Sequence, residues 1–300
     1  MNIRKICVIG AGTMGNGIAQ VAAQAKYETS MVDIKEDILN RGMDTIKSSL
    51  SRLVKKGALK PEDVEEVLKR IHTSTSIGEA SRDADFVIEA ALEKPEVKMS
   101  IFRQLDALCP EVTILGSTTT TIPIALLSSA TKRADKVIGT HFFNPVPVMR
   151  GAEVVRALST SEQTVQISLN LLQSFGKETV VVKDYPGFVS SRLLLIVLNE
   201  GAKVLEEGLG SLEDIDKIMK LSLNWPRGPL ELADIVGLDV VVDSMESIYR
   251  ETGWERYKPA PLLKRMVEIG YLGSKTGKGL YTLFRKSPES TAPEFLSVLP

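Results

Sequence analysis

The sequence predicts an α/β fold in which a domain built on a mostly parallel sheet is followed by an all-helical C-terminal domain. Short apolar runs alternate with helical patterns as far as Pro186-Gly187, and nearly everything beyond that point has helical spacing. The 300 residues also suit two modest domains better than one. We therefore expect one domain in residues 1–184 and a second in residues 185–300.

The apolar runs of the first domain predict strands, because each run is short and bounded by polar or turn residues. The predicted strands are residues 3–9, 29–32, 72–76, 85–90, 112–116, 136–141 and 178–182. Two helical patterns, 36–56 and 61–70, follow one another between the second and third strands, which is more than a crossover requires. Their basic residues either meet a polyanionic ligand or form a solvated face: Arg52, Lys55, Lys56, Lys60, Lys69 and Arg70.

The second domain is predicted to contain four helices and a short closing segment. The helices are residues 187–207, 211–223, 229–251 and 260–270, and residues 277–281 are predicted as a turn with a short extended piece. The run from Leu193 to Leu198 is apolar on more than one helical face, so we expect it to be buried on both sides. A single crowded core satisfies this, but we favour a homodimer that forms through the helical domain.

The composition restricts the possible partners. With 37 basic and 38 acidic side chains, the chain has no broad positive field for nucleic acid or an anionic membrane, so a small molecule is the expected partner. Cys7 and Cys109 have no metal-ligand spacing, and we expect two packed thiols and no metal site. No apolar stretch reaches the ~20 residues that span a bilayer, so we expect a cytoplasmic or organelle-matrix protein.

A glycine motif, Gly10-Ala11-Gly12-Thr13-Met14-Gly15, lies between the first predicted strand and a helical pattern. Gly10 permits a tight turn, Gly12 allows a pyrophosphate to approach the backbone, and Gly15 allows the helix to pack on the strand. Asp33, at the end of the second predicted strand, is placed to bind the adenosine ribose. The motif predicts a Rossmann-type domain that binds NAD rather than NADP.

Only two histidines are present, so few groups are available as a base near neutral pH. His141 ends a predicted strand and therefore belongs at the ligand-binding edge of the sheet, whereas His72 opens a strand after a charged helix and is expected to be a surface or packing residue. Glu153 follows 12 residues after His141. A carboxylate on one imidazole nitrogen would prepare the other to accept a hydroxyl proton. From spacing alone, a water-facing glutamate beside an ordinary core histidine is equally open.

Several long motifs, in the same order, resemble L-3-hydroxyacyl-CoA dehydrogenases over almost the whole chain. These are Gly10–Gly15, Ile88–Lys98, His141–Met149, Asp184–Leu194 and Gly228–Asp239. The resemblance implies NAD-dependent oxidation of a 3-hydroxyacyl-CoA to the 3-oxoacyl-CoA, or the reverse reduction, in fatty acid metabolism. It implies that His141 is the catalytic base and that Glu153 orients it. It further implies that Asp33, Glu93 and Lys98 contact NAD.

Three positions depart from the family pattern. Thr118, near the nicotinamide, and Ser191 stand where relatives have asparagines, and Thr120 stands where a substrate-contacting serine is usual. Loss of two amide donors either accompanies a site remodelled for an unusual acyl group or weakens catalysis, since one donor aimed at an oxyanion is worth ~3 kcal/mol. Retention of both His141 and Glu153 favours remodelling.

Further departures bear on the acyl group. Arg227 occupies a position where methionine is common, and it either binds a carboxylate at the far end of a dicarboxylic acyl chain or lies at the surface. Gly151 and Ala152 are smaller than the usual residues and are predicted to widen the acyl pocket. Two other functions remain open: a catalytically weakened dinucleotide-binding sensor or structural protein, and a dehydrogenase of a hydroxy acid without coenzyme A.

Overall fold

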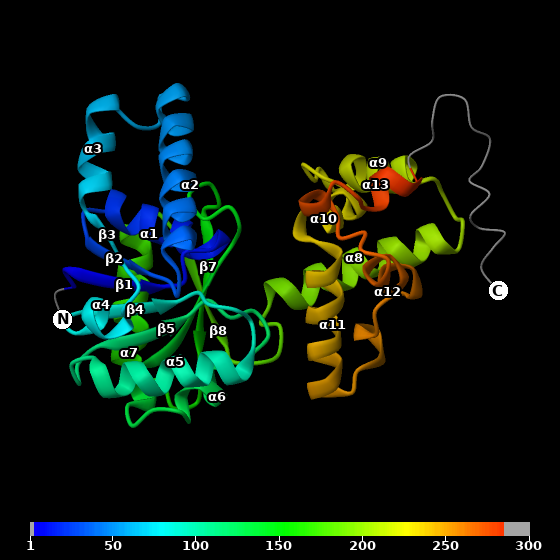
Figure 1. The fold of residues 1–300 in the computed structure, drawn as a ribbon. Coiled ribbons are helices and arrows are strands. Elements are labelled where there is room, and N and C mark those ends of the chain that lie inside the picture. The colour runs from blue at the N-terminus through cyan, green and yellow to red at the C-terminus, as the bar shows by residue number, and fades with distance from the viewer. Residues whose placement is uncertain (1–2, 285–300) are drawn as a thin grey trace. The chain divides into compact units, whose positions relative to one another are not determined.

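A computed structural model describes residues 3–284 of the chain. The chain divides into two compact units, Met1–Phe188 and Val189–Pro300. The first unit combines a sheet with helices, and the second is helical where the structure describes it (Figure 1). The predicted fold class, a mostly parallel α/β sheet followed by a helical C-terminal part, is confirmed.

Eight strands form one sheet in the first unit. They are β1 (Lys5–Ile9), β2 (Glu28–Val32), β3 (Ile71–Ser74), β4 (Phe86–Glu89), β5 (Ile114–Ser117), β6 (Val137–Phe142), β7 (Gly151–Arg156) and β8 (Glu178–Lys183). Their order is β3-β2-β1-β4-β5-β6-β7-β8. Neighbouring strands are parallel except β6 and β7, which are antiparallel. Strand β7 is absent from the strands predicted from the sequence.

Helices cover both faces of the sheet (Figure 1). They are α1 (Thr13–Gln24), α2 (Glu36–Lys55), α3 (Pro61–Lys69), α4 (Ile77–Ser81), α5 (Pro95–Leu108), α6 (Ile124–Ser128) and α7 (Glu162–Ser174), with a 3-10 turn at Ala134–Lys136. Alternate residues of β1 point to opposite faces. Val8 packs in one apolar cluster with residues of α1, α2 and α7, and Cys7 packs in another with residues of α5 and α6. Cys7 and Cys109 are free and buried, as predicted.

The second unit has its own apolar core. Its helices are α8 (Ser190–Glu206), α9 (Leu212–Leu223), α10 (Pro229–Val236), α11 (Leu238–Thr252), α12 (Pro261–Glu268) and α13 (Leu280–Phe284), with 3-10 turns at Glu255–Tyr257 and Ser274–Thr276. The single helix predicted over 229–251 is wrong, because Gly237 has a φ of 102° and ends α10. Leu193 is 65% exposed in the single chain, so this chain alone does not cover every face of the apolar run of α8.

The prediction of a turn with a short extended piece over residues 277–281 is correct only for its first residues. Gly277 lies in a turn and Lys278 forms an isolated β-bridge with Gly273. Leu280 begins α13, whose first amide groups donate hydrogen bonds to the buried carboxylate of Asp234. A carboxylate at this position satisfies amides that have no partner within the helix, and it stabilises the helix dipole. The start of α13 therefore depends on a long-range contact with Asp234, which the local sequence does not reveal.

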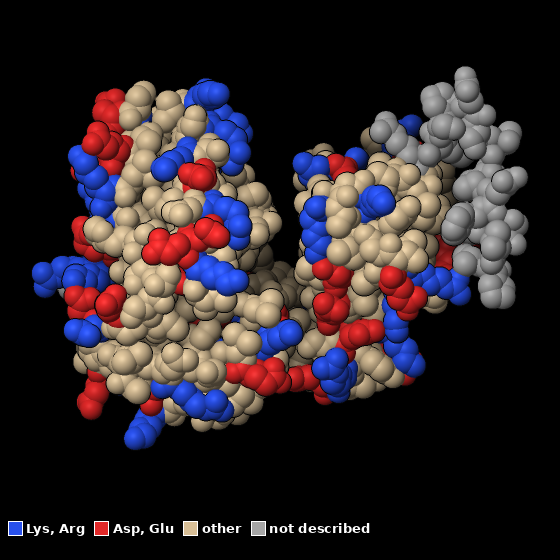
Figure 2. All heavy atoms as spheres, in the orientation of Figure 1, with Lys and Arg blue, Asp and Glu red and all other residues tan. Residues whose placement is uncertain are grey.

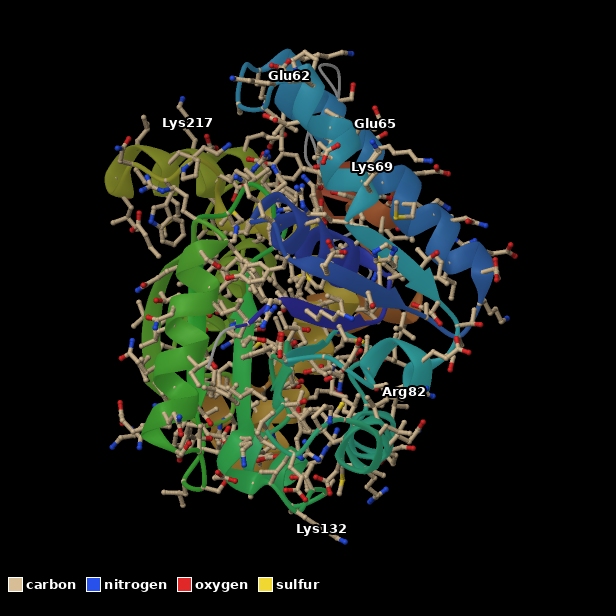
Figure 3. The ribbon with its side chains drawn as sticks, turned by 90° about the vertical axis from the view of Figure 1, so that its left-hand side faces the viewer. Glu62, Glu65, Lys69, Arg82, Lys132 and Lys217 are labelled. Atoms are coloured by element: carbon tan, nitrogen blue, oxygen red, sulfur yellow. The ribbon has the colours of Figure 1, made fainter. Side chains whose placement is uncertain are left out.

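The surface carries both signs of charge. Figure 2 shows acidic and basic side chains interspersed on the visible face of each unit. Lys69 of α3 projects outward beside Glu65 (Figure 3), with its Nζ 3.1 Å from the Glu65 carboxylate. This basic residue therefore belongs to a solvated ion pair, which is one of the two roles that its sequence context allowed. Among residues 3–284, no helix combines the length and the apolar character needed to cross a bilayer.

Candidate active site

The glycine motif joins β1 to α1 as a tight turn. Gly10 has a φ of 105°, and its amide donates to the carbonyl oxygen of Val32. A Cβ atom on Gly15 would lie 1.7 Å from the carbonyl oxygen of Gly10, so this position has no room for a side chain. Gly12 instead faces open space, with nothing within 4 Å of a Cβ position. The turn therefore leaves the start of α1 accessible to a ligand.

Asp33 follows β2 and ties its end to the glycine motif. Its Oδ2 accepts a hydrogen bond of 2.8 Å from the amide of Ala11, and its Oδ1 accepts one from the amide of Ile34. Each carboxylate oxygen keeps a further lone pair. Asp33 is therefore both part of the turn and available to hydroxyl donors beside it.

A cavity of about 410 Å³ adjoins the glycine motif within the first unit. Residues of α1, α2 and the loop at 144–147 line it, and Arg41 and Arg52 of α2 are its basic residues. The loop is held by the buried side chain of Lys177, whose Nζ donates to the carbonyl oxygens of Val146 (2.5 Å) and Met149 (2.7 Å). Burial lowers the pKa of this ammonium group.

His141 and Glu153 are cross-strand neighbours. They are directly paired in the antiparallel ladder of β6 and β7, and both side chains are more than nine-tenths buried. The Nδ1 of His141 lies 2.7 Å from Oε2 of Glu153. A carboxylate only accepts, so Nδ1 carries the hydrogen and Nε2 of the neutral ring keeps its lone pair. The two residues are thus brought together, and the alternative of a water-facing Glu153 is wrong.

Two phenyl rings fix the surroundings of the imidazole. The ring centroids of Phe143 and Phe188 lie 5.3 and 5.5 Å from that of His141, both in edge contacts. Gly151 leaves room for Phe143, whose ring would lie 3.1 Å from a Cβ atom there. Ala152 faces the other side of the sheet and packs in the core, so it does not widen an acyl pocket.

Thr120 lies against the free nitrogen of this histidine. Its hydroxyl oxygen is 3.3 Å from Nε2 of His141, the ring nitrogen that does not face Glu153. Thr120 belongs to a turn of four threonines, residues 118–121, after β5. The amide of Thr118 donates to the carbonyl oxygen of Glu89, so β4 and β5 end side by side at this turn.

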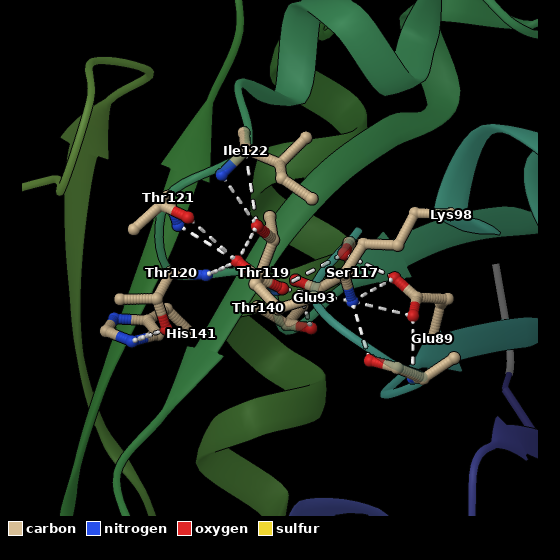
Figure 4. A network of polar contacts seen from close by, with 11 residues as sticks. Glu89, Glu93, Lys98, Ser117, Thr119, Thr120, Thr121, Ile122, Thr140 and His141 are labelled. Atoms are coloured by element: carbon tan, nitrogen blue, oxygen red, sulfur yellow. Dashed lines mark hydrogen bonds and ion pairs between the residues drawn. The ribbon is translucent and has the colours of Figure 1, made fainter. Parts of the chain in front are cut away.

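A charged network continues from the threonine turn toward the interior (Figure 4). Lys98 of α5 is 1% exposed and donates to both carboxylate oxygens of Glu89, which is fully buried at the end of β4. The same Nζ lies 3.3 Å from Oε2 of Glu93. Burial alone would raise the pKa of Glu93, but the charge of Lys98 and hydrogen bonds from Thr119–Thr121 hold this pKa below its usual value. Glu93 is therefore ionised at neutral pH.

Models of known protein families match the sequence of both units. Residues 5–185 match the model of the 3-hydroxyacyl-CoA dehydrogenase NAD binding domain, and residues 187–283 match the model of the C-terminal domain of that enzyme. The chain belongs to the 3-hydroxyacyl-CoA dehydrogenase family. Its activity is the NAD-dependent oxidation of a 3-hydroxyacyl-CoA to the 3-oxoacyl-CoA, or the reverse reduction, which makes it an oxidoreductase of fatty acid metabolism.

Individual relatives show the same similarity. A probable 3-hydroxybutyryl-CoA dehydrogenase of Bacillus subtilis is 43% identical over 96% of this chain and 100% of its own. The mitochondrial hydroxyacyl-coenzyme A dehydrogenase of Homo sapiens is 40% identical over 93% and 91%. The crystal structure of (S)-3-hydroxybutyryl-CoA dehydrogenase from Ralstonia eutropha superposes with a TM-score of 0.87, at 46% identity, over 93% of this chain and 98% of the other.

Two predicted substrate residues of this dehydrogenase lie in the second unit. Ser191 is buried in the first turn of α8. Arg227 pairs with the carboxylate of Glu231 in α10, which also meets the Nζ of Lys220 at 2.8 Å. Arg227 is thus held by an acidic neighbour within its own unit, and a carboxylate ligand would have to compete with that neighbour.

Sequence reasoning missed several members of the site. Glu89, Ser117 and Thr119 join the charged network, and Phe143 and Phe188 pack on His141. Glu89 had a usable signal, because an acidic residue at the end of a buried parallel strand requires a partner. The roles of the two phenylalanines depend on contacts between segments far apart in the chain, which the local pattern does not encode.

Proposed function

We propose that His141 is the general base in oxidation of the 3-hydroxyl and the general acid in the reverse reduction, with Glu153 as its orienting partner. The contact of 2.7 Å between Nδ1 and the Glu153 carboxylate carries this proposal. The hydroxyl proton passes to Nε2 while the C3–H bond breaks with its electron pair, and Glu153 stabilises the resulting imidazolium. In the reverse direction the imidazolium returns the proton to the ketone oxygen.

We assign NAD binding to the first unit, because its residues fit that group. The residues are Gly10, Gly12, Thr13, Met14, Gly15, Asp33, Glu93, Lys98 and Thr118. Gly12 leaves its side of the turn open, as the approach of a pyrophosphate requires, and Asp33 retains acceptor positions for ribose hydroxyls. A 2′-phosphate would be repelled by the same carboxylate. When bound, NAD supplies the acceptor of the hydride.

Substitutions of Gly12 and Gly15 distinguish an effect on cofactor binding from an effect on folding. We expect Gly12→Ala to leave the free energy of unfolding nearly unchanged, since its methyl group meets no atom, but to weaken NADH binding at least about tenfold. Gly15→Ala places a methyl group on the Gly10 carbonyl and should cost about 1–3 kcal/mol of stability. Urea denaturation and NADH fluorescence titration measure the two effects. Equal stability loss in both variants would contradict this assignment.

For the substrate, we propose a coenzyme A thioester whose 3-hydroxyl meets Thr120 and His141, with Ser191 as a further hydroxyl donor. The relatives named as 3-hydroxybutyryl-CoA dehydrogenases make the four-carbon acyl group the first to test. NADH oxidation is followed with acetoacetyl-CoA and then with free acetoacetate. We expect turnover with the thioester alone. Turnover with the free acid would favour a substrate without coenzyme A, and NADH binding without any turnover would favour a sensor.

A second substrate class, dicarboxylic acyl thioesters, depends on Arg227. The guanidinium of Arg227 is half exposed. If it left Glu231 and bound the terminal carboxylate of a substrate, it would still form a charge-assisted hydrogen bond. If this proposal is correct, Arg227→Ala lowers kcat/KM for a dicarboxylic substrate about tenfold or more and leaves that for acetoacetyl-CoA unchanged. Equal effects on both substrates would assign Arg227 a structural role only.

We further propose that residues 185–300 bind substrate and form a homodimer. On α9, Ile218 and Leu221 are 59% and 72% exposed, and Leu223 follows at 52%. Exposed apolar side chains on one helix favour burial by a second copy. Leu221→Lys should therefore convert the dimer to a monomer in light scattering, whereas Lys217→Glu, outside this apolar set, should not. A cytoplasmic location also remains a proposal, since one named relative is mitochondrial.

A further inference from the structure

We propose that Glu93 is a positioning residue that sets the catalytic geometry through the threonine turn, residues 118–121, in addition to any contact with the cofactor. This inference rests on the proposed role of His141 as the base. In this role, the Glu93 carboxylate holds the hydroxyl of Thr120 beside the imidazole of His141.

One oxygen of Glu93 gathers four donors from the threonine turn (Figure 4). Its Oε1 accepts from the hydroxyl of Thr119 at 2.6 Å and from the amide of Thr120 at 2.8 Å. It also accepts from the amide of Thr121 at 3.1 Å and from the hydroxyl of the same residue at 3.3 Å. Charge-assisted hydrogen bonds are about twice as strong as neutral ones, so this single atom is the main anchor of the turn.

The other oxygen of Glu93 forms an ion pair with Lys98. Its Oε2 lies 3.3 Å from the Nζ of Lys98, which is itself fixed by the buried carboxylate of Glu89. Lys98 also donates to the carbonyl oxygen of Ala91, so the segment that carries Glu93 is tied to the same ammonium group. The carboxylate is thus oriented on both sides, and its position is set by the interior of the sheet.

Thr120 links this anchor to the chemistry. Its amide donates to Glu93, while its hydroxyl oxygen lies 3.3 Å from Nε2 of His141. The side chain of Thr120 is short, so its hydroxyl moves with its backbone. Movement of the threonine turn therefore displaces this hydroxyl from the imidazole of His141. A shift of about 1 Å in a reacting geometry costs on the order of a hundredfold in rate. Glu93 therefore acts on the reaction through Thr120.

A double-mutant cycle tests this inference, with kcat measured at saturating NADH and acetoacetyl-CoA. Glu93→Gln keeps the shape but offers only one oxygen to the turn and to Lys98, and Thr120→Val removes the hydroxyl. We expect each single variant to lose about ten- to a hundredfold in kcat, and the double variant to lose no more than the poorer single one. In a Thr120→Ser background, which restores the hydroxyl, the loss caused by Glu93→Gln should return.

Two control variants separate positioning by Glu93 from a general effect of its charge. Glu96→Gln, an exposed acid in the first turn of α5, should retain full turnover. Glu93→Asp keeps the charge for Lys98 but is too short for the turn, so it should lose kcat as Glu93→Gln does. Independent losses that multiply in the double variant, or a change in NADH affinity without a change in kcat, would overturn the positioning role. Turnover by His141→Ala would instead overturn the proposed function.

Discussion

His141→Ala lowers kcat by about 10³- to 10⁴-fold and leaves the dissociation constant of NADH within about twofold. The first effect follows because a positioned general base contributes up to about four orders of magnitude in rate, and Nε2 of His141 is the nitrogen left free by Glu153. The second follows because the glycine motif and Asp33 lie beyond the ends of β1 and β2, and not on the strand that carries His141. NADH oxidation with acetoacetyl-CoA and NADH fluorescence measure the two quantities on the same preparation.

His72 provides a matched control, since it is the second of the two histidines. Its side chain is 64% exposed on β3 and pairs with Glu28 at the surface, which is one of the two roles, surface or packing, that the sequence predicted. His72→Ala should therefore retain full turnover. Equal kcat in His141→Ala and the unmodified protein would end the assignment of the base.

Lys98→Met is expected to cost about 3–5 kcal/mol in the free energy of unfolding of the first unit. The variant leaves the carboxylate of Glu89 buried and without its cation, and an uncompensated buried charge carries a penalty of this size. Hydrogen bonds from Ser117 and the amide of Ala91 remain, but they do not replace the lost charge. Urea denaturation followed by far-UV circular dichroism measures the change.

Two variants show whether the penalty comes from the unpaired charge. Glu89→Leu added to Lys98→Met removes both members of the pair, and it should recover much of the lost stability because apolar pairs replace buried ion pairs at little cost. Lys69→Met removes a solvent-exposed ion pair with Glu65 on α3, and it should leave the midpoint of urea denaturation nearly unchanged. A double variant no more stable than Lys98→Met would show that the unpaired charge is not the cause.

Sequence patterns within a few residues predicted the features of this fold that depend on neighbouring residues alone. The glycine motif, Asp33 and the position of His141 at a strand end all follow from strand and turn chemistry within a few residues. Strand β7 did not follow, because Gly151 and Ala152 after a proline-rich loop carry a weak strand signal. Gly237 was placed inside a helix for a similar reason, since a single glycine is tolerated there until the tertiary structure requires a positive φ.

The charged network at the threonine turn was harder to predict. Glu93 and Lys98 were expected from family resemblance, but the contacts that unite them with residues 118–121 join the ends of β4 and β5 across sequence separations of more than twenty residues. Spacing in the chain carries no information about such a meeting. The sequence therefore indicated Glu93 and Lys98, but it indicated neither the network that they form with Glu89, Ser117 and Thr119 nor the sharing of one Glu93 oxygen among four donors.

The antiparallel ladder of β6 and β7 determines what a change in the loop between these strands can affect. His141 and Glu153 are register partners on adjacent strands, so backbone hydrogen bonding, and not the intervening loop, fixes the distance between proton acceptor and carboxylate. Insertions or deletions in residues 143–150 leave that spacing intact, whereas a one-residue slip would turn Glu153 to the opposite face. Changes in this loop that keep the contacts of Phe143 and Lys177 would therefore alter the wall of the cavity beside the glycine motif without changing the distance between His141 and Glu153.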